Sequence, residues 1–192
     1  NPASAVSMLN TAVGYDAGNA VTTGVRNTLI GGLAGDANTT GSYNVALGSY
    51  ALTADTLGAR NVAIGRSALQ AQNFTSATSS YNTAMGYAAG AAVTTGLRNT
   101  YIGGLAGDEA TTANDNTGVG YGALSAPGTG TQNTAIGTAA LNVNTDGDNN
   151  TAVGRNALLA NTTADNNTAV GYNSQVLVTT GAQNTSLGAY AL

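Results

Sequence analysis

Acidic residues at short spacing are the first candidates for chemistry in this chain. The stretch NTDGDNN, at 144–150, places Asp146 and Asp148 two residues apart, as in part of a calcium-binding loop. A complete calcium loop supplies more ligands, including a later acidic residue, and that pattern is absent. A polar turn therefore explains the stretch better. We interpret three further acidic residues in the same way, as solvated turn residues: Asp108, Glu109 and Asp115.

Arginine and tyrosine form a second group of candidates. Arg26, Arg60 and Arg98 each directly precede an Asn that begins a repeated motif, and Tyr43 and Tyr81 hold the same place in other copies. Together with tyrosines that follow the motif, they could line a glycan-binding row. Surface decoration is the alternative, which we favour because neither position is uniform along the chain. The tyrosines after the motif are Tyr15, Tyr87, Tyr121 and Tyr172.

The residue types that are missing exclude several kinds of catalysis. The chain has no His and no Cys, so the usual zinc, haem and iron–sulfur ligand sets and the Ser–His–Asp and Cys–His nucleophiles cannot be assembled. Its only cationic side chains are five arginines, and the net charge of -4 does not suit a phosphate-tracking surface for nucleic acid. No apolar run reaches the roughly 20 residues of a membrane span. We expect no enzyme, no cofactor, no metal and no nucleic-acid partner.

The element that must position every side chain is a short repeat. NTAVG, or a close variant, occurs eleven times, and nine of the ten intervals between motif asparagines equal that from Asn10 to Asn27, a period of seventeen. The remaining interval, from Asn61 to Asn82, is longer by four, and residues 82–112 closely copy residues 10–40. A fixed short period is typical of a solenoid, in which each repeat is one coil stacked on the next. The motif asparagines are Asn10, Asn27, Asn44, Asn61, Asn82, Asn99, Asn116, Asn133, Asn150, Asn167 and Asn184.

Numbering the coil from its Asn as column 1 gives each column a physical interpretation. Columns 2 and 4 are Thr or Val and an aliphatic residue, so we expect them to share the buried face of a strand. Column 3, mostly Ala, and column 9, often Leu, then remain as apolar stripes that mark a contact surface between chains. Column 5 is always Gly, which suits a bend with positive φ. These glycines are Gly14, Gly31, Gly48, Gly65, Gly86, Gly103, Gly120, Gly137, Gly154, Gly171 and Gly188.

The pattern predicts an all-β parallel solenoid, or β-roll, of about eleven coils with two short strands and two turns in each. We expect residues 1–9 to form a lead-in and residues 10–192 a single repeat domain. Each motif Asn lies above its own copies in such a stack, so its amide can run a structural ladder of hydrogen bonds along the axis.

The motif resembles a known family. NVAIG at Asn61–Gly65, NTAIG at Asn133–Gly137 and NTAVGRNALL at Asn150–Leu159 are similar to the SVAIG head repeats of trimeric autotransporter adhesins and to arrays in phage tail fibres and spikes. The resemblance implies a left-handed β-roll, three chains in a rod, and a role in attachment outside a cell or on a virion. The period here is longer than the usual head repeat, and the chain as given shows no anchor or stalk. We expect partners in identical chains, in flanking fibre domains and in a surface glycan or receptor.

The four extra residues between Asn61 and Asn82 predict a protruding loop, which could serve recognition or be a tolerated insertion. Its candidate residues are Gln70, Gln72, Asn73 and Phe74. Two alternatives to attachment stay open. Ice binding would need a flat outward array of Thr. A polysaccharide-degrading spike would need paired carboxylates across a groove.

Overall fold

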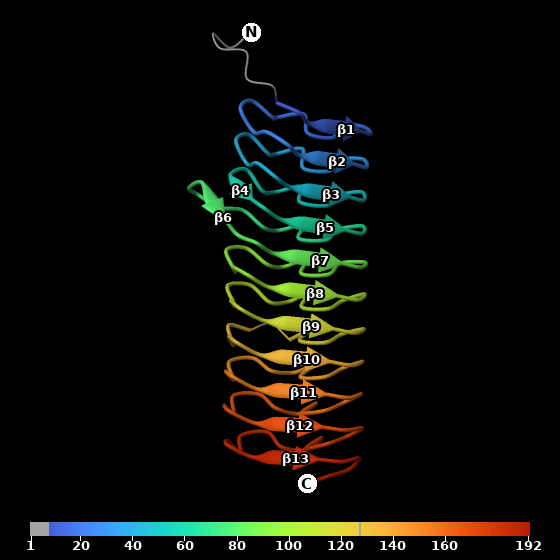
Figure 1. Cartoon of the computed structure of the whole chain (residues 1–192), viewed down its shortest axis with the longest axis vertical. Coiled ribbons are helices and arrows are strands. Elements are labelled where there is room, and N and C mark those ends of the chain that lie inside the picture. The colour runs from blue at the N-terminus through green and yellow to red at the C-terminus, as the bar shows by residue number, and fades with distance from the viewer. Residues whose placement is uncertain (1–7, 127) are drawn as a thin grey trace.

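The chain folds into a straight stack of coils (Figure 1). The structure is a computed structural model that describes residues 8–126 and 128–192, so most of the expected lead-in, 1–7, lies outside the described residues. Eleven strands of three residues form one parallel sheet along the stack. They are β1 Thr11–Val13, β2 Thr28–Ile30, β3 Val45–Leu47, β5 Val62–Ile64, β7 Thr83–Met85, β8 Thr100–Ile102, β9 Thr117–Val119, β10 Thr134–Ile136, β11 Thr151–Val153, β12 Thr168–Val170 and β13 Thr185–Leu187.

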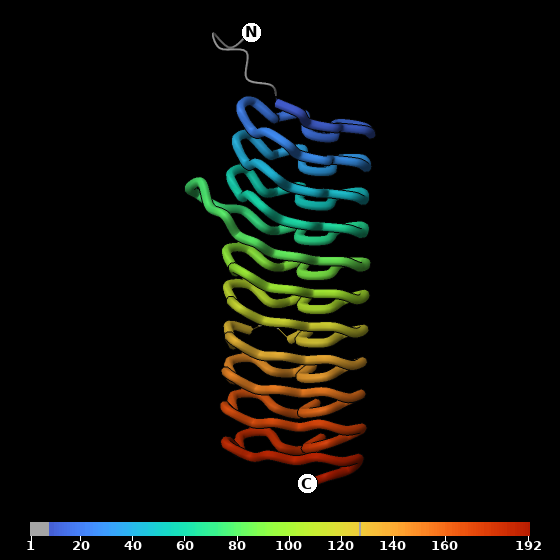
Figure 2. The backbone as a smooth tube through the Cα atoms, in the orientation of Figure 1, coloured from blue at the N-terminus to red at the C-terminus, as the bar shows by residue number. Residues whose placement is uncertain are grey.

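Strand pairing follows the repeat in strict register. Each strand pairs with the next copy of itself, as Thr11 pairs with Thr28 and Thr134 with Thr151. Val62 pairs with Thr83 across the longer spacing, so the extra residues leave the sheet without a register shift. Figure 2 shows the coils succeeding one another along the axis, with one excursion of the backbone. The parallel β-solenoid predicted from the period is confirmed.

The expected inside and outside of the sheet are reversed. Column 3 faces inward: Ala46, Ala63 and Ala152 are fully buried, whereas columns 2 and 4 face out and Leu47 in column 4 is 42% exposed. The reason is the width of the coil. So short a closed loop encloses little space, so a small column-3 residue fits where column 9 carries Leu, and the β-branched residues of columns 2 and 4 point outward.

The core is filled by a complementary choice of residues in columns 3 and 9. Leu69, Leu141 and Leu158 in column 9 are fully buried, so this column is no exposed stripe. Where column 3 carries Leu29, column 9 is Gly on both sides, and an added Cβ at Gly18 would lie 2.7 Å from the Leu29 side chain. Tyr101 is likewise bordered by column-9 glycines at 90 and 107. Column 3 therefore supplies the large side chain where column 9 is Gly, and column 9 supplies it in most of the coils where column 3 is Ala or Gly, so that the core stays filled.

One strand per coil is observed instead of two. The only other strands among the described residues are β4 Gly58–Ala59 and β6 Thr78–Ser79, which pair with each other beside the insertion. Columns 7 and 9 hold positive φ angles, for example 62° at Tyr50 and 51° at Leu52. This side of the coil therefore runs as successive turns, which still donate hydrogen bonds to the next coil, such as Leu52 N to Ala68 O at 3.1 Å.

Candidate functional site

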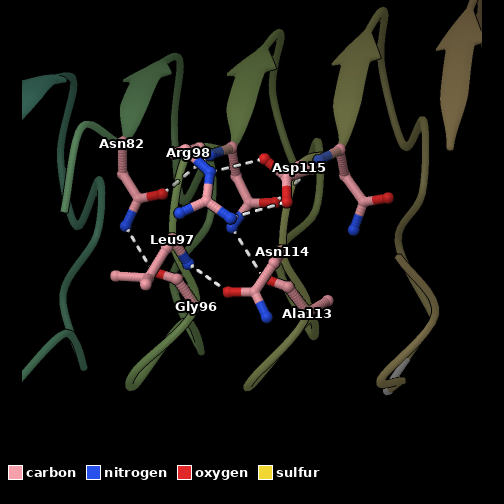
Figure 3. Close-up of polar contacts among 9 residues, drawn as sticks. Asn82, Gly96, Leu97, Arg98, Ala113, Asn114 and Asp115 are labelled. Carbon is pink, nitrogen blue, oxygen red and sulfur yellow. Dashed lines mark hydrogen bonds and ion pairs between the residues drawn. The ribbon is translucent and has the colours of Figure 1, made fainter. Parts of the chain in front are cut away.

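The motif asparagines tie each coil to itself and to the next. Each Oδ1 from Asn10 to Asn167 accepts a hydrogen bond from the main-chain N–H of the following motif Asn, at 2.8 to 3.1 Å. Most Nδ2 groups donate to a column-15 carbonyl that closes the same coil, as Asn82 does to Gly96 at 2.7 Å (Figure 3). The ladder therefore joins side chains mainly to the main chain, where it satisfies buried polar groups that would otherwise lack partners.

The column-5 glycines allow a turn that no other residue fits. All eleven have φ between 128° and 142°, a region open essentially only to Gly. A Cβ built at Gly103 would lie 2.5 Å from the carbonyl oxygen of Gly120 in the next coil. The motif Gly is thus required both by its own backbone conformation and by the close stacking of coils.

The insertion is only partly a surface loop. Gln72 and Phe74 are buried, at 0% and 6% exposed, whereas Gln70 and Asn73 lie on the surface. Gln72 is held between coils, because its Nε2 donates to Asp55 Oδ2 at 2.6 Å and its Oε1 accepts from Asn82 Nδ2 at 2.8 Å. Two of the four expected recognition residues therefore serve the core. Gln72 does so because it continues column 12, which is buried in the coils on either side.

Asp55 is the buried carboxylate of this cluster. It is 1% exposed and accepts hydrogen bonds from Gly58 N at 2.9 Å and from Gln72. Burial raises the pKa of Asp55 above its ordinary value, although these hydrogen bonds act in the opposite direction. Sequence reasoning missed this residue; its signal was an acidic residue in a column that carries Asn, Val or Ala in most other coils.

The acidic residues of the suspected calcium turn bond to neighbouring coils. Asp146 accepts from Thr129 Oγ1 at 2.8 Å, and Asp148 accepts from Thr131 N at 2.6 Å. No group of three or more acidic residues that could hold a metal ion occurs within the described residues. These contacts agree with the interpretation as polar turn residues.

The arginines and tyrosines form two separate rows, at opposite ends of the strands. In column 17, which precedes each motif Asn, the guanidinium carbon of Arg60 lies 5.3 Å from the ring centroid of Tyr43 and 5.7 Å from that of Tyr81. In column 6, after the strand, Arg66 lies 5.8 Å from the ring of Tyr87. The structure does not bring the two columns into the single row that the sequence suggested.

The column-17 row ends in an ion pair. Arg98 Nε and Nη2 donate to the two carboxylate oxygens of Asp115 at 2.6 and 2.7 Å (Figure 3). The Arg98 guanidinium holds the pKa of Asp115 below its usual value, although both side chains are largely exposed. This is the only ion pair in the described part of the chain.

The outer face of the large sheet is the most continuous surface feature. Column 4 presents exposed aliphatic side chains along its length, among them Val13, Met85, Ile102 and Ile136 at 37% to 58% exposed. Thr occupies column 2 in most strands, beside this apolar column. The sequence signal for this arrangement was the small size of the column-3 residues, which are mostly Ala. It indicates that columns 2 and 4, not column 3, form this outer face.

One depression in the surface of the described residues has a carboxylate in its lining. An open depression of about 480 Å³ is lined by residues that include Glu109, Ser125, Asn142 and Thr145. Glu109 is the one carboxylate among these, whereas glycoside hydrolysis uses a pair.

No helix long and apolar enough to cross a membrane is found in the described residues. Comparison with protein-family models, curated proteins and solved structures finds nothing that matches the chain.

Proposed function

We propose that the chain is a non-enzymatic attachment module, a segment of an extracellular fibre, adhesin or virion tail fibre that assembles as a homotrimeric rod. The observation that carries this proposal is the outer sheet face, where aliphatic column-4 side chains lie exposed or half-exposed along eleven strands. A continuous apolar stripe on a soluble rod marks a contact surface. Contact between identical chains covers such a stripe along its full length.

The geometry of the stripe favours self-association. Every strand presents the same two columns in register, so two copies can meet over many coils with one repeated contact. Column-2 hydroxyls beside the aliphatic row suit an interface that is apolar at its centre and polar at its rim. We take three chains, rather than two, from the resemblance to adhesin head repeats, together with attachment and flanking fibre domains as partners.

Light scattering coupled to size exclusion tests the assembly. We expect the chain to elute as a trimer and Ile136→Lys combined with Ile102→Lys to elute as a monomer with an unchanged circular dichroism spectrum. Leu177→Lys is the matched control, because Leu177 is 83% exposed but lies outside the outer sheet face. A wild-type monomer at high concentration would contradict the trimer. Retention of the labelled chain on cells tests attachment separately.

Ice binding is the second candidate, and one observation favours it. Column-2 threonines such as Thr134, Thr151 and Thr168 point outward in an in-register row on a sheet of regular spacing. Bulky aliphatic residues in column 4 make this face less regular than a Thr-only array. If the chain is a monomer and shows thermal hysteresis, ice binding replaces the trimer proposal. If it is a monomer without thermal hysteresis, both the trimer and ice binding are wrong.

A further inference from the structure

We propose that Arg26, Tyr43, Arg60 and Tyr81 form a binding strip for an anionic polysaccharide that lies along the rod axis. The inference rests on the proposed attachment function and names the ligand class of one surface. These four residues occupy column 17 in successive coils, and all are exposed. We call them the Arg–Tyr strip.

The strip is an alternating stack of cations and aromatic rings. The Tyr43 ring lies between two guanidinium groups, with Arg26 at 5.4 Å and Arg60 at 5.3 Å from its centroid. Arg60 then lies 5.7 Å from the ring of Tyr81. Arg26 Nη1 also donates to Tyr43 Oη at 2.8 Å, and Arg60 donates to Ser79 Oγ. Stacking between rings pre-organises the arginines, which reduces the entropy lost when a ligand binds.

The two guanidinium charges have no carboxylate partner in the described part of the chain, where the single ion pair is Arg98–Asp115. Each arginine uses its Nη1 group within the chain, so the Nε and Nη2 groups on one edge of its guanidinium are left to meet a ligand. A planar guanidinium edge binds a carboxylate or sulfate through paired hydrogen bonds. The strip thus offers anion sites, not sugar-stacking platforms.

The spacing of the charges selects the ligand. Arg26 and Arg60 are two coils apart, which corresponds to about 10 Å at the usual separation of paired strands. That distance is comparable to the length of two linked sugar rings, so one anionic group per disaccharide matches the strip. A DNA duplex carries one phosphate per about 3.4 Å of helix axis on each strand, so most of its charge would lie between the two arginines.

The strip has a defined end. The next arginine of the column, Arg98, follows Tyr81 with the same periodicity, but Asp115 occupies its guanidinium edge in a two-point contact. Further along, the column carries Gln132, Asn149 and Asn166. The same periodicity therefore predicts that removing the Asp115 charge adds a third anion site.

Titration of the intact chain with hyaluronan, which carries one carboxylate per disaccharide, tests the strip. Neutral dextran serves as the uncharged control and double-stranded DNA as a competitor. We expect saturable, salt-sensitive binding that Arg60→Gln weakens about tenfold, the effect of one lost charge-assisted contact. Gln already occupies this column at Gln132 with φ of 59°, against 63° at Arg60, so the variant keeps the backbone.

Asp115→Asn is the decisive variant, because it should strengthen binding several-fold. Asn tolerates the positive φ of 59° at this position. Arg155→Gln, in column 6, is the control for Arg60→Gln, because it removes the same charge, and it should leave affinity unchanged. Three results would each overturn the proposed strip: the chain does not bind hyaluronan, Arg155→Gln weakens binding as much as Arg60→Gln does, or DNA at the same concentration of charge displaces the bound hyaluronan. If the chain adheres to cells but does not bind hyaluronan, the proposed strip is wrong and the attachment function stands. If the chain neither adheres to cells nor binds hyaluronan, the attachment function is wrong as well.

Discussion

Replacing Asn99 by Ala should destabilise the rod more than any exposed substitution of the same type. Asn99 is fully buried; its Oδ1 accepts from Asn116 N at 3.0 Å and its Nδ2 donates to Ala113 O at 2.8 Å. Alanine leaves both main-chain groups without these partners. Each buried polar group that loses its partner costs about 1–3 kcal/mol, so we expect a loss of about 4 kcal/mol in the free energy of unfolding. A domain of ordinary stability, about 5–15 kcal/mol, would be strongly weakened.

Urea unfolding followed by far-ultraviolet circular dichroism measures this loss. Asn19→Ala is the control, because Asn19 is exposed and its side chain makes no hydrogen bond within the described residues; its effect should stay within about 0.5 kcal/mol. The dependence on urea should keep the same slope in both variants, so that the midpoint reports stability. A cost for Asn99→Ala no larger than that of the control would refute the reasoning that the ladder stabilises the stack.

Three further substitutions test other parts of the fold. Gly103→Ala should lower the free energy of unfolding, measured in urea, by more than about 3 kcal/mol. Its φ of 131° disfavours any side chain, and the new Cβ would lie 2.5 Å from the Gly120 oxygen. Gly32→Ala is the control and should be near neutral, because the nearest atom to its new Cβ is 3.9 Å away. Leu69→Ala should lower stability by about 2–5 kcal/mol, since a fully buried side chain is removed from the narrow core; a cost below about 1 kcal/mol would mean that the coil collapses around the cavity. Asp55→Asn should flatten the pH dependence of stability. Burial raises the folded-state pKa of Asp55, so its stabilisation is complete below the ordinary value of 3.8 and is lost as pH rises through the raised pKa; an unchanged profile in the variant would contradict this assignment.

The period of the sequence determined the architecture. Eleven Asn–Gly motifs at a nearly constant spacing admit one arrangement, a parallel stack in which each coil repeats its neighbour, because identical residues must then meet identical residues. The glycine requirement was also readable, since an invariant Gly after a strand indicates a backbone conformation closed to other residues. The site of the insertion followed from the single longer spacing.

Only the tertiary structure decided which face of the strand is inside. Alternation along a strand separates column 3 from columns 2 and 4 but does not say which set is buried, and hydrophobicity alone favoured the wrong set. The width of the closed coil settles the choice: column 3 holds Ala63 opposite Leu69, or Leu29 opposite glycines, while the side chains of columns 2 and 4 point outward. The tertiary structure also decided three other features: the burial of Gln72, the pairing of the large Leu29 with the small Gly18, and the stacking of Arg60 on Tyr43. Each depends on residues of neighbouring coils that lie side by side only after the chain has closed on itself.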